Sequence, residues 1–185
     1  EFRRVLFRSI VTAPLRLALT GTPGTGKTTL AGMFSAAGWS LLSVEELAAD
    51  AGALGEIDPV DDAHPIDLDL LHDSLAESWK AAPAEPTIID GHLSHHLPID
   101  AVAVLRCDPA TLRGRLQSRG YAAAKTESNV EWEIIGGAWN EREGEESWAE
   151  FDTSEASAEF VFAAICDWAS DGFKPASPEA VIDWI

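Results

Sequence analysis

The sequence has 185 residues, 46% of them hydrophobic, which fits one domain with a sizeable core and argues against a disordered chain. Its 31 acidic and 13 basic residues give a net charge of −18, which excludes direct nucleic-acid binding through a basic patch. Such a charge fits simple solubility or, more specifically, adaptation to high salt. The sequence contains no run of about 20 apolar residues and no secretory signal pattern, so we expect a soluble cytoplasmic protein that binds no membrane.

The first nine residues differ in charge from the rest of the chain. Arg3, Arg4 and Arg8 are three of only thirteen basic residues. We therefore expect residues 1–9 to be a non-native leader and residues 10–185 to form a single domain.

The first half of the chain predicts strands that alternate with helices. An apolar run at 15–20 predicts a buried strand, and good helix formers with one apolar face predict a helix at 27–37. A second strand is expected at 39–44 and a helix at 45–51. The acidic stretch at 52–65, which contains several Pro and Gly residues, is typical of a mobile insertion.

The second half continues this alternation. We expect a helix at 67–80 and strands at 87–90 and 100–106. The next helix runs through Arg119, with Asp108 as N-cap and Pro109 in its first turn. A helix at 129–142, a short run at 147–152 and a helix at 155–169 follow. Alternating strands and helices indicate a parallel sheet with both faces covered. The predicted fold class is α/β, with three αβα layers around a five-stranded parallel sheet.

A phosphate-binding motif lies between the first predicted strand and helix. Gly21 to Thr28 read GTPGTGKT and fit G-x-x-x-x-G-K-[ST], the pattern of a P-loop. Glycines let backbone N–H groups face phosphate oxygens, and the following helix contributes its positive end. The competing explanation is a glycine-rich turn with an exposed lysine. The predicted ATP-binding residues of the loop are Gly24, Thr25, Gly26, Lys27, Thr28 and Thr29.

Polar residues follow the strand predicted at 87–90. Asp90 ends that strand, where a carboxylate can hold Mg²⁺ together with the hydroxyl of Thr28, although it could instead be a helix cap or turn residue. His92 could orient the attacking group or a water, or bond a loop carbonyl. His95 and His96 suggest a metal site, but no cysteine partner and no HExxH helix supports zinc.

Three arginines follow in the helix predicted after Pro109. Arg115 and Arg119 are four residues apart and share one helix face. Guanidinium groups match phosphate oxygens in bidentate geometry, so we expect both to bind ATP and Arg119 to stabilise the transferred phosphoryl group. Surface ion pairs are the alternative, above all for Arg113.

With these residues identified, the chain resembles the atypical adenylate kinases that also act as small-subunit ribosome-assembly factors, the family of the coilin-interacting nuclear ATPase. Archaea carry similar proteins, and the charge suggests a haloarchaeal member. The matching stretches are GTPGTGKTT at 21–29, PIDLDLL at 65–71, IIDGHLSHHLP at 88–98, LRCDPATLRGRLQSRGY at 105–121 and KTESNVEWEI at 125–134.

The resemblance implies specific roles for several residues. It places Asp90 and His92 in the family's Asp-x-His element and implies that Arg119 closes over ATP. It also implies an insertion that binds the nucleoside monophosphate at about 43–68 and a short lid at about 118–128. The implied reaction converts ATP and AMP into two ADP with Mg²⁺, beside a slower ATPase activity and binding to an S11-type small-subunit ribosomal protein.

Three functions remain open from the sequence. The first is a nucleoside monophosphate kinase whose catalytic residues are Lys27, Asp90, His92 and Arg119. The second is an ATPase switch that binds a ribosomal protein, and the third is a small-metabolite kinase of the shikimate or dephospho-coenzyme A type.

Ser128 departs from the resemblance, since the family's pattern has an acidic residue there.

Overall fold

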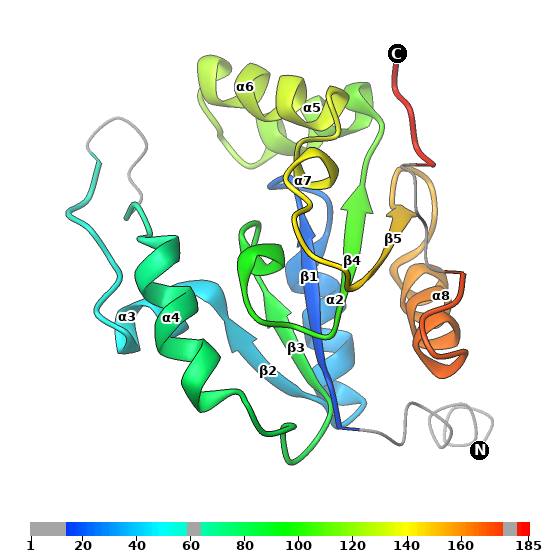
Figure 1. Cartoon of the computed structure of the whole chain (residues 1–185). Coiled ribbons are helices and arrows are strands. Elements are labelled where there is room, and N and C mark those ends of the chain that lie inside the picture. Colours follow the sequence, from blue (N-terminus) through cyan, green and yellow to red (C-terminus); the bar gives the residue numbers. More distant parts are fainter. Residues whose placement is uncertain (1–13, 59–63, 176–180) are drawn as a thin grey trace.

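The computed structural model describes residues 14–58, 64–175 and 181–185 (Figure 1). The expected leader at 1–9 lies outside the described residues, as do residues 59–63 of the expected insertion. None of the helices in the described ranges is both long enough and apolar enough to cross a membrane.

A five-stranded parallel sheet forms the centre of the molecule, as the sequence predicts. Its strands run in the order β2-β3-β1-β4-β5, and every neighbouring pair is parallel. The strands are β1 (Arg16–Gly21), β2 (Ser40–Ser43), β3 (Thr87–Asp90), β4 (Ala101–Arg106) and β5 (Ser147–Asp152). The central strands β1 and β4 are buried along their whole length, which explains their nearly continuous apolar sequences.

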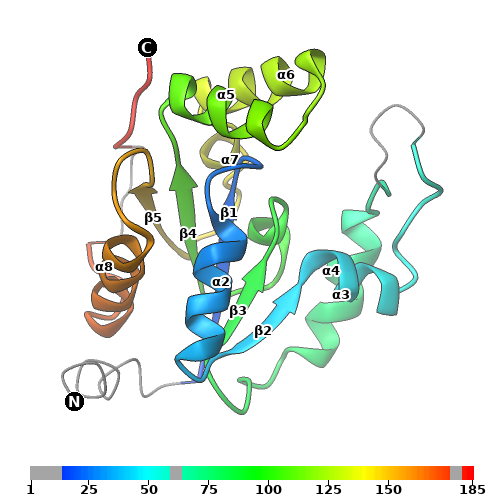
Figure 2. The same ribbon diagram turned by 180° about the vertical axis from the view of Figure 1, so that it is seen from behind.

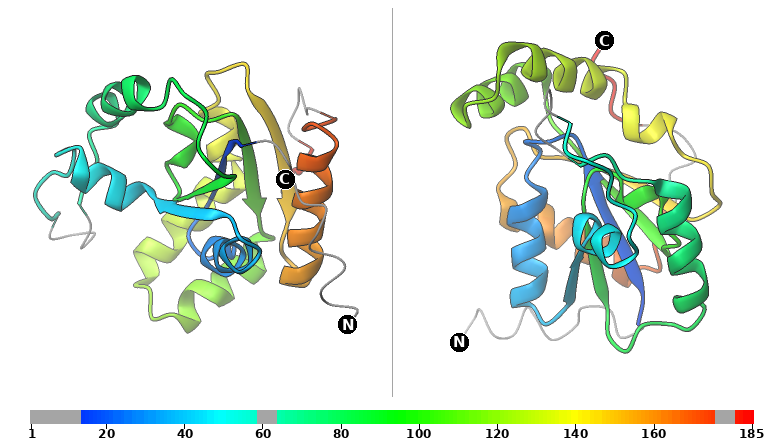
Figure 3. Two further views of the ribbon diagram at one scale, coloured as in Figure 1. Left: turned by 90° about the horizontal axis from the view of Figure 1, so that it is seen from below. Right: turned by 90° about the vertical axis from the view of Figure 1, so that its left-hand side faces the viewer.

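Helices cover both faces of this sheet (Figures 1 and 3). The helices are α2 (Lys27–Ala36), α3 (Val44–Asp50), α4 (Leu68–Ser78), α5 (Pro109–Ser118), α6 (Ala123–Ile134), α7 (Gly137–Asn140) and α8 (Ala158–Ser170), with a 3₁₀ turn η1 (Ser94–His96). On one face Leu17 and Leu19 pack in a cluster with Phe34 of α2 and Ile165 of α8. The opposite face is covered by separate clusters that involve α3, α4 and α7. The result is the predicted three-layer arrangement.

Two helices lie across the carboxyl edge of the sheet. In Figures 1 and 2, α5 and α6 extend over the ends of β1 and β4, above the loop that joins β1 to α2. Helix α5 starts as predicted: the Asp108 carboxylate accepts a hydrogen bond of 2.9 Å from Thr111 N, and Pro109 is its first residue. This start places α5 directly over the glycine loop.

The helix predicted at 129–142 is wrong in both its start and its continuity. Helix α6 begins at Ala123 and ends at Ile134, and α7 is a separate short helix. Gly136, at φ 65°, adopts a left-handed conformation that ends the first helix and precedes the second. The earlier start lets Thr126 and Val130 bury one face of α6 beside α5.

Candidate functional site

The glycine loop lies between β1 and α2, as the motif predicts. Gly24 and Gly26 have φ values of 95° and 102°, a region that other residues rarely adopt. A Cβ on Gly24 would lie 2.9 Å from Leu112 Cδ1, so α5 packs against the loop backbone itself. Thr25 Oγ1 donates a 2.9 Å hydrogen bond to Thr22 O and closes the turn. The loop therefore has the backbone conformation that a phosphate-binding nest requires.

Lys27 begins α2 and folds back over this loop. Its Nζ donates hydrogen bonds to Gly21 O at 2.6 Å and to Thr22 O at 2.9 Å. Burial lowers the pKa of Lys27 to about 8, and the positive charge of Arg119 adds to this effect while Asp90 opposes it. The ammonium group is thus mostly charged at neutral pH and lies in a site with little competing solvation.

Two cavities open on either side of the loop. Besides the loop, the larger cavity, of about 560 Å³, is lined by Asp90 to Leu93 at the end of β3 and just after it, by Ser43 to Glu45 at the start of α3, and by His64. The smaller, about 350 Å³, is also lined by Arg115, by Thr153 after β5 and by apolar residues of α2 and α8. Gly24, Gly26, Thr29 and Arg119 line both cavities. The two spaces therefore meet at the phosphate-binding loop.

Asp90 and His92 face the larger cavity together with Thr28. Burial raises the pKa of Asp90, whereas Lys27 acts to lower it. Burial and the charge of Lys27 lower the pKa of His92, which keeps its imidazole neutral at pH 7. The Thr28 hydroxyl is exposed in the same cavity as the Asp90 carboxylate. The Thr28 hydroxyl and the Asp90 carboxylate are both hard oxygen ligands, and this pair of ligands fits Mg²⁺.

The three arginines have different surroundings. Arg119 is exposed and lines both cavities, and its side chain makes no hydrogen bond or ion pair with any described residue. Arg115 donates to Thr153 O at 2.6 Å and so anchors the segment after β5, beside the smaller cavity. Arg113 forms two hydrogen bonds, of 2.8 and 2.9 Å, with the Glu127 carboxylate. For Arg113 the structure thus shows the alternative expectation, a surface ion pair.

The expected insertion and lid adjoin the larger cavity. Within 43–68, Ser43, Glu45, His64 and Ile66 line this cavity. The expected lid at 118–128 comprises the end of α5, a turn that contains Arg119 and Tyr121, and the first half of α6.

His95 and His96, by contrast, line neither cavity. Burial lowers the pKa of His95 to about 4, so its ring is neutral at pH 7.

A buried carboxylate that sequence reasoning missed connects the loop to α6. Glu133 is 1% exposed and accepts hydrogen bonds from Thr22 Oγ1 and, at 2.7 Å, from Arg106 Nε. The backbone N–H of Cys107 donates to the same carboxylate at 3.1 Å. Its position three residues after the apolar Val130, on the buried face of α6, was the available signal.

Replacement of Glu133 with alanine should lower the free energy of unfolding by about 3 kcal/mol, because Arg106 would lose a buried partner and Thr22 its acceptor. Urea unfolding would measure this loss. The matched control is Glu131→Ala, an exposed carboxylate on the same helix, which should change stability little. Equal effects of the two substitutions would contradict a structural role for the Glu133 network.

Affinity for Mg·ATP should depend on pH through Lys27. Bound phosphates favour the charged ammonium, so affinity should be nearly constant below about pH 7 and fall as the pH rises through 8, by roughly eightfold between pH 7.5 and pH 9. Calorimetric titration of ATP at several pH values would test this. Lys27→Arg, whose guanidinium stays charged, should remove the dependence. A parallel fall in both proteins would assign the effect to another group.

Comparisons with known proteins agree with this architecture. Residues 17–136 match the family described as AAA domain. A "Putative adenylate kinase" of Thermococcus onnurineus is 36% identical over 170 residues, which cover 91% of this chain and 90% of that protein. A protein of the same description from Natronomonas pharaonis is 38% identical over 154 residues, 82% of this chain and 88% of its own.

Solved structures resemble the fold at low identity. A sugar kinase from Janibacter sp. HTCC2649 has a TM-score of 0.57 at 17% identity, covering 89% of this chain and 99% of its own. Deoxyadenosine kinase from M. mycoides has a TM-score of 0.54 at 15% identity, and the match covers 85% of this chain and 99% of that one. These likenesses show the α/β fold, and the sequence matches show the family. The chain belongs to the AAA-domain family of P-loop proteins, together with these archaeal relatives.

Proposed function

We propose that this protein is a nucleoside monophosphate kinase that transfers the γ-phosphoryl group of Mg·ATP to AMP and yields two ADP. The observation that carries the proposal is the pair of cavities that meet at one phosphate-binding loop. A phosphotransferase must hold a donor and an acceptor on opposite sides of the migrating group, roughly in line. An ATPase alone needs no second large cavity beside the loop.

The linings of the two cavities suggest which substrate each one takes. The smaller cavity combines the loop backbone with apolar side chains, Leu30 and Val161 among them, and suits the base and sugar of ATP. The larger cavity is bordered by the insertion and by Asp90 and His92, and suits the acceptor. The descriptions of the archaeal relatives as adenylate kinases support a nucleotide acceptor.

The proposed roles follow from charge and position. Lys27 and Arg119 would stabilise the charge on the migrating phosphoryl group, and loop amides would hold the β-phosphate. Thr28 and Asp90 would hold Mg²⁺, which neutralises charge between the β- and γ-phosphates. His92, neutral at the edge of the larger cavity, would orient the acceptor. Arg115 would support the ATP side of the loop through its contacts after β5.

The test is an acceptor screen with the purified chain. ATP is supplied with AMP, CMP, GMP, UMP, shikimate or dephospho-coenzyme A, and each product is separated and quantified. We expect AMP to give two ADP for each ATP consumed, with a slower release of phosphate when no acceptor is added. Transfer to shikimate or dephospho-coenzyme A but to no nucleotide would overturn the proposal.

The charge of the chain favours a second, additional role as a nucleotide-dependent binding partner of a basic protein. A net charge of −18 is electrostatically complementary to an S11-type ribosomal protein, and nucleotide binding beside Arg119 could change that affinity. Pull-down with purified S11-type protein, with ADP, with ATP and without nucleotide, would test this role. The salt concentration should match in all three, because screening weakens such contacts. Binding that ignores the nucleotide would contradict a switch.

A further inference from the structure

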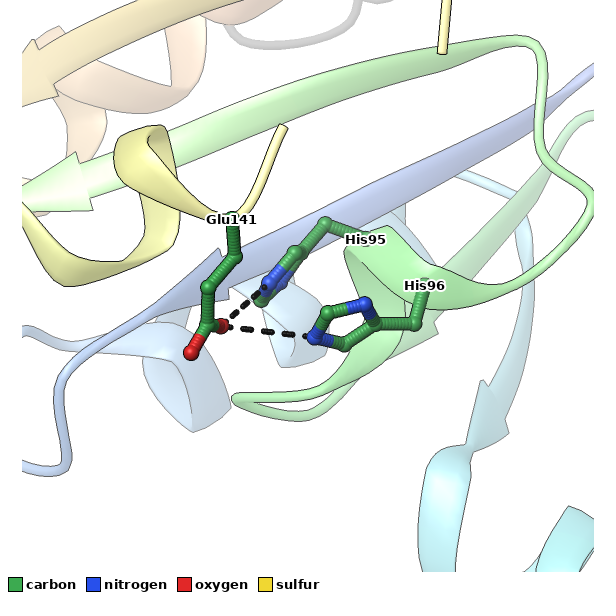
Figure 4. A group of neighbouring side chains, drawn as sticks. All are labelled: His95, His96 and Glu141. Carbon is green, nitrogen blue, oxygen red and sulfur yellow. Dashed lines mark hydrogen bonds and ion pairs between the residues drawn. The ribbon is translucent and has the colours of Figure 1, made fainter. Parts of the chain in front are cut away.

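A cluster of three metal-ligating side chains lies outside both cavities. His95 and His96 belong to η1, and Glu141 follows α7 (Figure 4). The Glu141 Oε2 atom is 3.0 Å from His95 Nε2 and 3.3 Å from His96 Nε2. One ligand atom from each residue lies within 4.8 Å of the others. Segments about 45 residues apart in the chain thus bring three ligand atoms close together.

Hydrogen bonds on the far side of the ring fix the tautomer of His95. Thr20 Oγ1 donates its only hydrogen to His92 O, at 2.9 Å. The same oxygen lies 2.8 Å from His95 Nδ1, so with the hydroxyl hydrogen used, Nδ1 is the donor in this contact. With Nδ1 as the donor, His95 Nε2 directs a lone pair at a carboxylate oxygen of Glu141. A metal ion bound by both atoms would remove the repulsion between two acceptors 3.0 Å apart.

We propose that His95 Nε2, His96 Nε2 and Glu141 Oε2 bind a divalent transition-metal ion of the zinc class. In a tetrahedral site with metal–nitrogen bonds of about 2.0–2.1 Å, neighbouring ligand atoms are about 3.3 Å apart. The separations of 3.0 and 3.3 Å are close to this value. Two imidazoles and one carboxylate are ligands that suit zinc, whereas Mg²⁺ prefers oxygen.

The burial of the cluster suits a bound ion. The side chain of His95 is fully buried, while those of His96 and Glu141 are 22% and 42% exposed. An ion could therefore enter from solvent and keep a water as its fourth ligand. The hydrogen bond from His95 Nδ1 to Thr20 is the kind of outer contact that orients a metal-binding imidazole.

The proposed ion would join two segments that border the phosphate site. Turn η1 follows Asp90 and His92 by a few residues, and α7 follows the end of α6. Thr20, at the end of β1, contacts both His95 and the carbonyl of His92. The ion would hold these segments together without contacting either cavity, and so it differs from the Mg²⁺ expected at Thr28 and Asp90.

The experiment uses the full chain, freed of metal with a chelator and kept in excess Mg²⁺ so that the phosphate site is saturated. Zn²⁺ is titrated by calorimetry, and Co²⁺ is added separately to record its visible absorption. We expect one Zn²⁺ per chain and the intense visible bands of tetrahedral Co²⁺. His96→Gln and Glu141→Gln should each weaken binding by at least about tenfold, and Thr20→Val by about 10- to 100-fold.

His72→Gln is the matched control, because His72 is a half-exposed histidine on α4 that is not among the three ligands of the cluster. It should leave Zn²⁺ affinity unchanged. Zn²⁺ should also raise the Tm of the native chain and not that of His96→Gln. Equal Zn²⁺ affinity in the native chain, His96→Gln and Glu141→Gln would overturn the proposal, as would an absence of stoichiometric binding. In either case the contact between His95 Nε2 and Glu141 Oε2 would be an ordinary hydrogen bond.

Discussion

Replacement of Lys27 with methionine is expected to lower the rate of AMP-dependent ADP formation by roughly a thousandfold. Lys27 is the only lysine among the described residues that lines either cavity. Its ammonium group interacts electrostatically with Asp90 and Arg119. In a site with little water, loss of one preorganised cation leaves the developing charge on the phosphoryl group uncompensated. Initial rates at saturating Mg·ATP and AMP would measure the effect.

The fold should survive this substitution. Burial disfavours the charged form of Lys27, and its two hydrogen-bond acceptors are carbonyls of the adjacent loop. The matched control is Lys80→Met, an exposed lysine beyond α4 that pairs with Glu77 at 2.5 Å. That variant should keep the native rate. A Lys27→Met protein with an unchanged melting curve and more than a tenth of the native activity would refute the proposed role of the loop.

Much of this architecture was predictable because its signals are local. The P-loop was found from spacing alone, since glycine at positions such as Gly24 is needed by the backbone, and the flanking strand and helix have clear apolar periodicity. The start of α5 was equally clear, because the Asp108 carboxylate accepts a hydrogen bond from the N–H of Thr111 and Pro109 occupies the first helical position. Asp90 and His92 follow an apolar strand, and parallel strands present their carboxyl ends at one edge.

The parts that sequence reasoning missed depend on contacts between distant segments. The gap predicted between Arg119 and a helix at 129 is too long, because α6 begins at Ala123 with its apolar face packed beside α5. The bond from Thr22 to Glu133 spans 111 residues, so the local pattern could indicate that Glu133 is buried but not that Thr22 is its partner. The same holds for Glu141, whose approach to His95 and His96 depends on the break at Gly136. Local spacing had therefore given no support for a metal site there.

Replacement of Arg119 with alanine is expected to lower kcat by about a thousandfold, with a smaller change in the affinity for ATP. Its guanidinium is exposed at the junction of the two cavities and is not engaged with any described residue, so it is available to the phosphoryl group in transfer. An arginine held by carboxylates could not do this without first breaking its ion pairs. Single-turnover rates, measured beside ATP binding, would separate the loss in the transfer step from a loss of binding.

Arg113→Ala provides the comparison, since this arginine lies on α5, which ends just before Arg119, but is paired with Glu127. Its removal should change kcat by less than about twofold, because surface ion pairs contribute little. Arg119→Lys should recover only part of the lost rate, as an ammonium cannot match two phosphate oxygens in the bidentate manner of a guanidinium. Equal losses in the Arg113 and Arg119 variants would show that the effect arises from the helix and not from a charge at the cavity junction.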